Sequence, residues 1–248
     1  MKRRRCQVLD TIRGCALVSM ILYHASWDLV YMFGADWPWY HGFAAHVWQQ
    51  SICWTFILLS GYCWALGRHQ LRRGLTVFLC GALITAVTGR FMPENLVYCG
   101  VLTLLGASAL VLIPLAPVLE RLPARAGLAG SFLLFLLFRD VNAGYLGFEG
   151  LRFAALPERL YRNRLTALLG FPPADFFSTD YFSLLPWFFL FLTGCFLFRL
   201  RPEETREIQQ VPLVTAMGRQ SLLIYMLHQP VIYALLTAGH FLLTGATA

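Results

Sequence analysis

The chain has 248 residues, of which 58% are hydrophobic and only 13% are charged, and its mean hydropathy is +0.59. A soluble domain carries about a quarter charged residues, so this composition excludes an ordinary soluble globular domain. We interpret the net charge of +7 as a signal of membrane topology and expect no nucleic-acid partner.

Apolar runs of about 20 residues, long enough to cross a bilayer, recur along the chain. Gly and Pro interrupt several of them, which transmembrane helices tolerate when neighbouring helices satisfy the backbone. The pattern predicts an all-α polytopic transmembrane bundle, formed as one domain over residues 1–248. We expect seven spans, each with boundaries defined to within a few residues, at residues 9–33, 46–67, 72–89, 97–118, 127–145, 182–199 and 219–243. For the fifth span, an end near Phe138 and a continuation through Tyr145 both stay open, since Arg139 and Asp140 interrupt the apolar run.

The basic residues indicate how these spans are oriented. They gather in residues 2–5, 68–73, 121–125 and 199–219, and short cytoplasmic loops retain Lys and Arg. The opposite side has no Lys or Arg from Gly34 to His46 and only Arg90 between the third and fourth spans. Its last loop, residues 139–181, is long, and long loops count little in the positive-inside rule. We therefore predict a cytoplasmic N-terminus and an extracytoplasmic C-terminus.

The first span carries Asp10, Arg13, His24 and Asp28. At 100° per residue, Arg13 and His24 differ by about 20° of rotation, and each Asp lies about 60° from Arg13. All four residues therefore share one side of the helix. Ionisable groups at membrane depth are costly and usually face a bundle interior or a wet cavity. The stripe predicts a functional site.

His24 is expected about 22 Å into the membrane from the cytoplasmic side, with Asp28 one turn beyond it. A carboxylate at i+4 can accept a hydrogen bond from one imidazole nitrogen and leave the other nitrogen basic, as a general base requires. The alternative is that His24 and Asp28 form a satisfied polar pair that ties helices together.

The last span repeats the pattern more weakly. Ser221, Tyr225 and His228 lie at i, i+4 and i+7 and share a face, and Gln229 and Pro230 follow. A kink at Pro230 would free carbonyl groups and open a cavity. The alternative is that His228 and Gln229 only hydrogen-bond a neighbouring helix.

The N-terminal MKRRR and the apolar run behind it could form a cleaved signal peptide, but the charges inside the run favour a retained helix. The seven cysteines are odd in number and form no C-x-x-C pair. They predict neither a disulfide framework nor a metal site, and we expect no metal and no permanently bound cofactor.

Six short motifs follow one another along the chain. They are LDTIRG (9–14), FILLSG (56–61), RRGL (72–75), YCGVL (98–102), LPW (185–187) and GRQSLLIY (218–225) with His228. Together and in this order they resemble the heparan-α-glucosaminide N-acetyltransferase-like family of membrane acyltransferases, as a short seven-helix form. The spacing from Arg13 to His24 also resembles that of membrane acyltransferases that O-acylate bacterial polysaccharides, and residues 24–27 resemble the sequence around the active histidine of the eukaryotic branch.

The resemblance implies a multi-pass enzyme of the bacterial inner membrane. It would transfer an acyl group from cytoplasmic acetyl-CoA, or another acyl-CoA, to an amino or hydroxyl group of an extracytoplasmic sugar or cell-envelope glycan. The catalytic residues expected are His24, with Asp28 orienting it, and His228. His24 would be the base or a transient acyl carrier, and direct transfer and an acyl-histidine intermediate both stay open.

Arginines suit the phosphates of acyl-CoA, because guanidinium groups make charge-assisted hydrogen bonds to them. For each loop arginine, anchoring by the positive-inside rule is the alternative. For the acceptor, Tyr225 and, in the outer loop, Asp180 are the candidates. The candidates for acyl-CoA are Arg13, Arg72, Arg73, Arg219 and Ser221.

Two other classes of protein stay open. A proton-coupled transporter would use the stripe of the first span as a relay, and a structural subunit would use its polar residues for packing alone. Dependence on acyl-CoA separates these classes from the acyltransferase. The partners expected are acyl-CoA, the sugar acceptor and the lipid bilayer, and a homodimer is left open.

Overall fold

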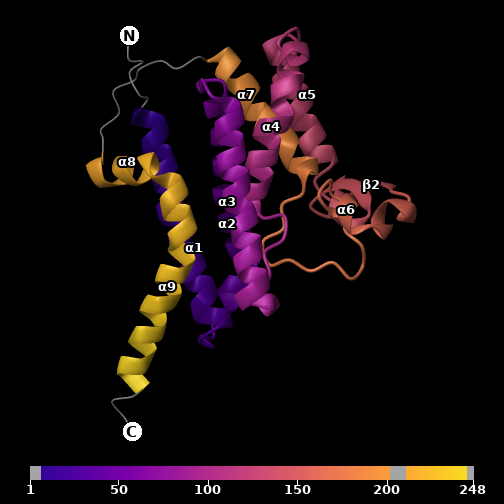
Figure 1. Ribbon diagram of the computed structural model, residues 1–248. Helices are drawn as coiled ribbons and strands as arrows, with labels where there is room; N and C mark the ends of the chain where they lie inside the picture. Colours follow the sequence, from indigo (N-terminus) through magenta and orange to yellow (C-terminus); the bar gives the residue numbers. More distant parts are fainter. Residues whose placement is uncertain (1–6, 202–210, 245–248) are drawn as a thin grey trace. The chain divides into compact units, whose positions relative to one another are not determined.

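The computed structural model describes residues 7–201 and 211–244, which are mostly helical and include one small hairpin (Figure 1). This confirms the all-α class. The longer helices are α1 (Gln7–Tyr31), α2 (Phe43–Trp64), α3 (Gln70–Phe91), α4 (Val101–Leu119), α5 (Ala124–Leu137), α7 (Leu184–Leu200), α8 (Pro212–Arg219) and α9 (Ser221–Thr244). The short elements are η1 (Pro38–His41), η2 (Pro93–Asn95), η3 (Val141–Ala143), β1 (Tyr145–Phe148), β2 (Leu151–Ala155), η4 (Glu158–Arg162) and α6 (Arg164–Ala167).

Five helical stretches in the described residues are long and apolar enough to cross a membrane. They are α1, α3, α4, residues 124–143 and residues 221–242, and α7 is apolar but shorter. The polytopic membrane fold is confirmed, whereas the count of seven spans and the sides of the termini stay predictions. The basic residues 2–5 and Arg206, which entered those predictions, lie outside the described residues, as does Cys6 from the cysteine pattern.

Two helix boundaries are defined by the structure. Of the two ends left open for the span expected at 127–145, the structure has the earlier one: α5 ends at Leu137, and η3 and strand β1 follow where Arg139 and Asp140 interrupt the apolar run. The span expected at 219–243 begins only at Ser221, since α8 ends at Arg219 and Gln220 separates the two helices. Helix α9 continues through Pro230.

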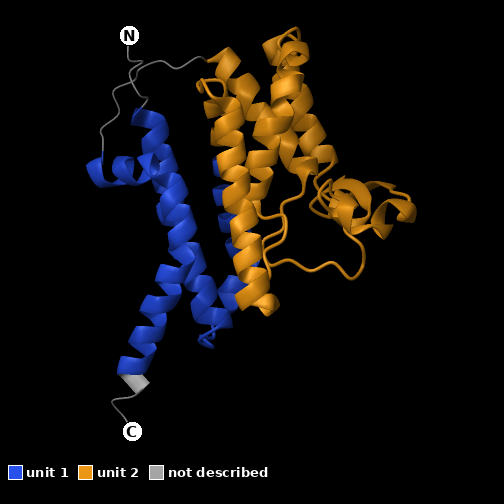
Figure 2. Cartoon of the chain, viewed as in Figure 1, with its two compact units in different colours: residues 1–56, 203–248 blue, residues 57–202 orange. Residues whose placement is uncertain are grey.

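The chain divides into two compact units, residues 1–56 with 203–248 and residues 57–202 (Figure 2). We call them unit 1 and unit 2. In unit 1, α1 packs against α8 and α9. A Cβ atom added to Gly218 would lie 1.7 Å from the Asp10 carbonyl oxygen, and one added to Gly14 would lie 2.0 Å from the Val214 carbonyl oxygen. Small residues let membrane helices approach this closely.

The first half of α2 completes unit 1. Leu17 and Met20 of α1 form a buried cluster with Ile52 of α2, and the Trp48 indole donates a hydrogen bond to Ser19 Oγ over 2.8 Å. The indole N–H needs such a partner when its ring is buried. These contacts fix the rotation of α1, and its polar stripe turns towards α8 and α9.

Unit 2 is held by helix pairs in close contact. Helix α3 packs on α4 and α5 on α7, and a Cβ atom on Gly61 would lie 1.9 Å from the Phe191 carbonyl oxygen. Ser131 and Thr193, both buried, share a hydrogen bond of 2.9 Å. The long loop expected at residues 139–181 contains η3, the β1–β2 hairpin, η4 and α6. The hairpin turn has Glu149 and Gly150 at positive φ, as a two-residue hairpin loop of type I′ requires.

Candidate functional site

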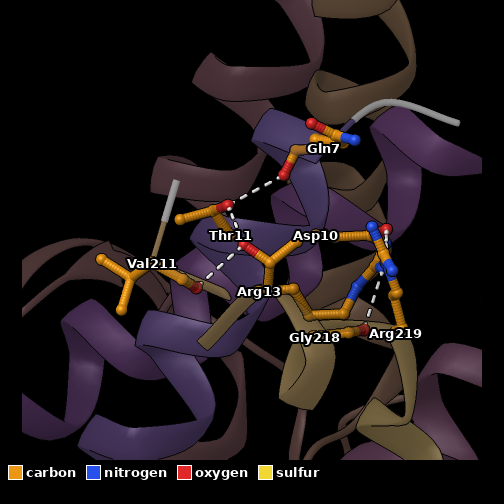
Figure 3. Close-up of polar contacts among 8 residues, drawn as sticks. Gln7, Asp10, Thr11, Arg13, Val211, Gly218 and Arg219 are labelled. Atoms are coloured by element: carbon orange, nitrogen blue, oxygen red, sulfur yellow. Dashed lines mark hydrogen bonds and ion pairs between the residues drawn. The ribbon is translucent and has the colours of Figure 1, made fainter. Parts of the chain in front are cut away.

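A buried carboxylate lies between two guanidinium groups where α1 meets α8 (Figure 3). Asp10 is only 4% exposed. Arg13 Nη1 lies 3.2 Å from its Oδ1, and Arg219 Nε lies 3.6 Å from its Oδ2. Arg13 also donates to the Gly218 carbonyl oxygen over 3.5 Å. These three side chains together carry one formal positive charge, which suits an anionic ligand.

The second polar cluster lies further along α1 and faces α9. The rings of His24 and His228 are 4.8 Å apart between centroids, at an interplanar angle of 62°. His228 Nδ1 lies 2.6 Å from the Tyr225 carbonyl oxygen, and the Tyr225 ring packs 5.2 Å from the His228 ring. The two histidines predicted from separate helices are therefore neighbours in one site.

Asp28 has a different partner from the one expected. It is fully buried, and its Oδ1 accepts a hydrogen bond of 2.6 Å from Gln229 Nε2. No hydrogen bond joins Asp28 to His24 within residues 7–201 and 211–244, so the expected i, i+4 pair does not form. The amide of the facing helix supplies the N–H instead. Asp28 therefore lies beside the histidine pair without orienting His24 directly.

The structure brings together most of the predicted residues of unit 1. His24, Asp28, Tyr225 and His228 form the cluster that we call the histidine cluster. Arg13, Arg219 and Asp10 form what we call the arginine cluster. Arg13 precedes His24 by eleven residues, which places the two residues about 16 Å apart along α1. Ser221 begins α9, one turn before Tyr225.

The other candidates belong to unit 2. Arg72 and Arg73 are exposed in the first turn of α3. Asp180 precedes α7, and its Oδ2 accepts a hydrogen bond of 3.3 Å from the backbone N–H of Val101, at the first turn of α4. It therefore connects the loop before α7 to the start of α4.

Gln229 is a contact that was not among the predicted site residues. It follows His228 directly, and the sequence offered this His–Gln pair only under the alternative that the pair hydrogen-bonds a neighbouring helix. What the pattern lacked was a partner, because a hydrogen bond to Asp28 depends on how α9 lies against α1. The structure adds Gln229 to the histidine cluster.

Replacing Asp180 by Asn should remove a pH-dependent loss of stability. Burial raises the pKa of the Asp180 carboxyl from 3.8 to about 6, against the opposing hydrogen bond from Val101. The folded state thus holds the proton more tightly than the unfolded chain, so stability present below pH 4 is lost as pH rises through 6. The full difference corresponds to about 3 kcal/mol. Melting temperatures in detergent between pH 4 and pH 7 should fall more for the wild type than for Asp180→Asn; parallel curves would contradict this.

Comparison with protein families identifies one over most of the chain. Residues 5–230 match the family model described as heparan-alpha-glucosaminide N-acetyltransferase, catalytic. Both clusters lie within the matched residues. No curated protein and no solved structure gives a significant match to the chain.

Proposed function

The chain belongs to the heparan-alpha-glucosaminide N-acetyltransferase catalytic family, and from this premise we propose which molecules it joins. Family and fold together make it a membrane acyltransferase. The donor in our proposal is acetyl-CoA, or another acyl-CoA, on the cytoplasmic side. The acceptor is an amino or hydroxyl group of an extracytoplasmic sugar or cell-envelope glycan, and the enzyme lies in the bacterial inner membrane.

The contact between His24 and His228 is the observation that carries this proposal. Two imidazoles in contact at membrane depth are costly, and such groups mark functional sites. Imidazole is also the side chain best suited to general acid–base chemistry and to transient acyl transfer. His24 acts either as the base that deprotonates the acceptor or as the transient carrier of the acyl group.

The arginine cluster is the proposed site for the anionic part of acyl-CoA. Asp10 contacts both guanidinium groups, which holds Arg13 and Arg219 in place before a ligand arrives. Pre-ordered guanidiniums bind phosphates at a lower entropic cost than free side chains. Ser221, two residues after Arg219, would add a hydroxyl. Arg72 and Arg73, which lie in unit 2, are separate candidates for the phosphates of acyl-CoA.

The separation of the two clusters suits a donor of this shape. About 16 Å of α1 lies between Arg13 and His24, and the pantetheine arm of CoA connects its phosphates to a distant thioester. Phosphates at the arginine cluster would thus direct the thioester along α1 towards His24. Tyr225 of unit 1 is proposed to contact the acceptor, and Asp180 of unit 2 is a separate candidate for this role.

Release of free CoA by the purified protein in nanodiscs tests the proposal. Acetyl-CoA should be consumed when an amino sugar from a panel is present, and only slowly without one, because the acyl group needs an acceptor. Empty nanodiscs give the background rate. A proton-coupled transporter would not consume the thioester, and a structural subunit would not bind it. Absence of CoA release with every acceptor would contradict acetyl transfer.

A further inference from the structure

Three buried polar atoms in the histidine cluster have no hydrogen-bond partner in the described residues. They are Asp28 Oδ2, Gln229 Oε1 and His228 Nε2. Leaving such an atom unpaired destabilises the folded protein, so each requires an explanation. The Asp28–Gln229 hydrogen bond and the His24–His228 contact lie one turn apart on α1, so the three atoms belong to one small region.

The hydrogen bond of His228 fixes which of its nitrogens is basic. Nδ1 lies 2.6 Å from the Tyr225 carbonyl oxygen, which can only accept, so Nδ1 carries the proton. In the neutral ring, Nε2 then has a free lone pair. This backbone carbonyl performs for His228 the orienting role that was expected of Asp28 for His24.

The other two unpaired atoms are acceptors as well. The Gln229 amide turns its N–H towards the Asp28 carboxylate, which leaves Gln229 Oε1 and Asp28 Oδ2 free to accept. Three acceptors without donors call for a ligand that supplies several N–H or O–H groups. A thioester has none, whereas a polyol or an amino-polyol has many.

We propose that Asp28 and Gln229 hold the acceptor through its hydroxyl or amino groups, and that His228 Nε2 takes the proton of the attacking group. This inference rests on the proposed function and names the base and the acceptor subsite within it. With His228 as the base, the role left for His24 is acyl carriage. A His24 ring nitrogen bonds to the acyl carbon, the bond from that carbon to the CoA sulfur breaks, and the ring N–H proton goes to the thiolate. The acceptor heteroatom then bonds to the acyl carbon, its proton passes to His228 Nε2, and the bond from the acyl carbon to the His24 nitrogen breaks. His228 then gives the proton to that nitrogen.

His228→Gln in nanodiscs, with glucosamine as acceptor, tests the assignment of the base. We expect kcat to fall about 100-fold with the KM for acetyl-CoA unchanged, and the acidic limb of the kcat/KM profile to disappear. His24 of α1 and Tyr225 of α9 also face this ring, and Asp28 lies one turn from His24 on α1, so His24→Ala is profiled in parallel. Leu227→Ala, an exposed neighbour on α9, is the matched control.

Gln229→Leu tests the subsite separately. The KM for glucosamine should rise at least about 10-fold, as loss of one hydrogen bond in a buried site predicts, with the KM for acetyl-CoA unchanged. A deoxy-glucosamine that lacks the hydroxyl bound there should lose less affinity in the variant than in the wild type.

The outcomes separate this inference from the proposed function. If the wild type transfers acetyl groups but His228→Gln keeps both its rate and its acidic limb, the assignment of the base is wrong. If Gln229→Leu changes both KM values equally, the subsite is wrong. If the wild type releases no CoA with any acceptor, the proposed function and this inference fall together.

Discussion

Replacing His24 by alanine should lower kcat for acceptor-dependent CoA release by a factor on the order of 100 or more. The His24 ring lies 4.8 Å from the His228 ring, so its loss removes an imidazole that no other side chain on α1 can replace. Helix α1 should still form, since alanine favours helices. The measurement is single-turnover and steady-state CoA release by the wild type and the variant in nanodiscs.

Binding of acetyl-CoA should survive this substitution, because the arginine cluster lies about 16 Å away along α1. An unchanged KM for acetyl-CoA with a much lower kcat would show that His24 acts in the transfer step and not in binding of the donor. Leu22→Ala, at a position 55% exposed on the same helix, controls for loss of a side chain from α1. If His24→Ala leaves turnover unchanged, the protein is still an acyltransferase, but His24 is not one of its catalytic residues.

The polar stripe of α1 could be predicted from the sequence because it depends on one helix alone. A rotation of 100° per residue places Arg13 and His24 on one side whatever surrounds them. The same periodicity grouped Tyr225 and His228 on the last helix. His24 of the first group faces His228 of the second in the structure, and periodicity explains why each group was visible separately.

The pairings across helices could not be predicted in this way. Whether Asp28 bonds to His24 or to Gln229 depends on the rotation and depth of α9 against α1. Close contacts at Gly14 and Gly218 determine how α8 lies on α1, and a pattern of apolar residues does not encode them. The sequence placed Asp10 in the polar stripe of α1, but it did not predict the contact of Asp10 with Arg219. That contact depends on Arg219 belonging to α8, which ends before α9 begins, with Gln220 between the two helices.

The loop between α5 and α7 shows a different limit. Its hairpin is short, and β2 is exposed throughout. A strand with no buried face needs no alternation of apolar and polar residues, so the sequence lacked the pattern that predicts a strand. The signal present was the Gly150 turn, which allows the positive φ that a tight hairpin needs. Charges distributed over the loop obscured it.

Replacing Gly218 by alanine should cause the largest loss of stability of any substitution considered. The added Cβ would lie 1.7 Å from the backbone oxygen of Asp10, and a backbone atom cannot move aside as a flexible side chain can. Inserting a group into a tight contact costs about 1–3 kcal/mol, and more where backbone must shift. The melting temperature in detergent, followed by tryptophan fluorescence, should fall by several degrees.

Gly239→Ala is the matched control for this substitution. It also lies in a helix of unit 1, but a Cβ there would meet nothing within 4 Å. Alanine favours a helix by up to about 1 kcal/mol over glycine, so this variant should be as stable as the wild type or slightly more so. A lower melting temperature for Gly218→Ala and an equal or higher one for Gly239→Ala would show that the loss of stability comes from the contact between α1 and α8.

Gly218→Ala also tests whether the arginine cluster depends on the close contact between α1 and α8. Moving α8 away from α1 would separate Arg219 from Asp10 and the Gly218 carbonyl from Arg13. If these contacts hold the guanidiniums for acyl-CoA, Gly218→Ala should raise the KM for acetyl-CoA at temperatures where the variant is folded. A variant that melts with the wild type would show that α8 does not need this close approach, and a destabilised variant with an unchanged KM would separate the packing from donor binding.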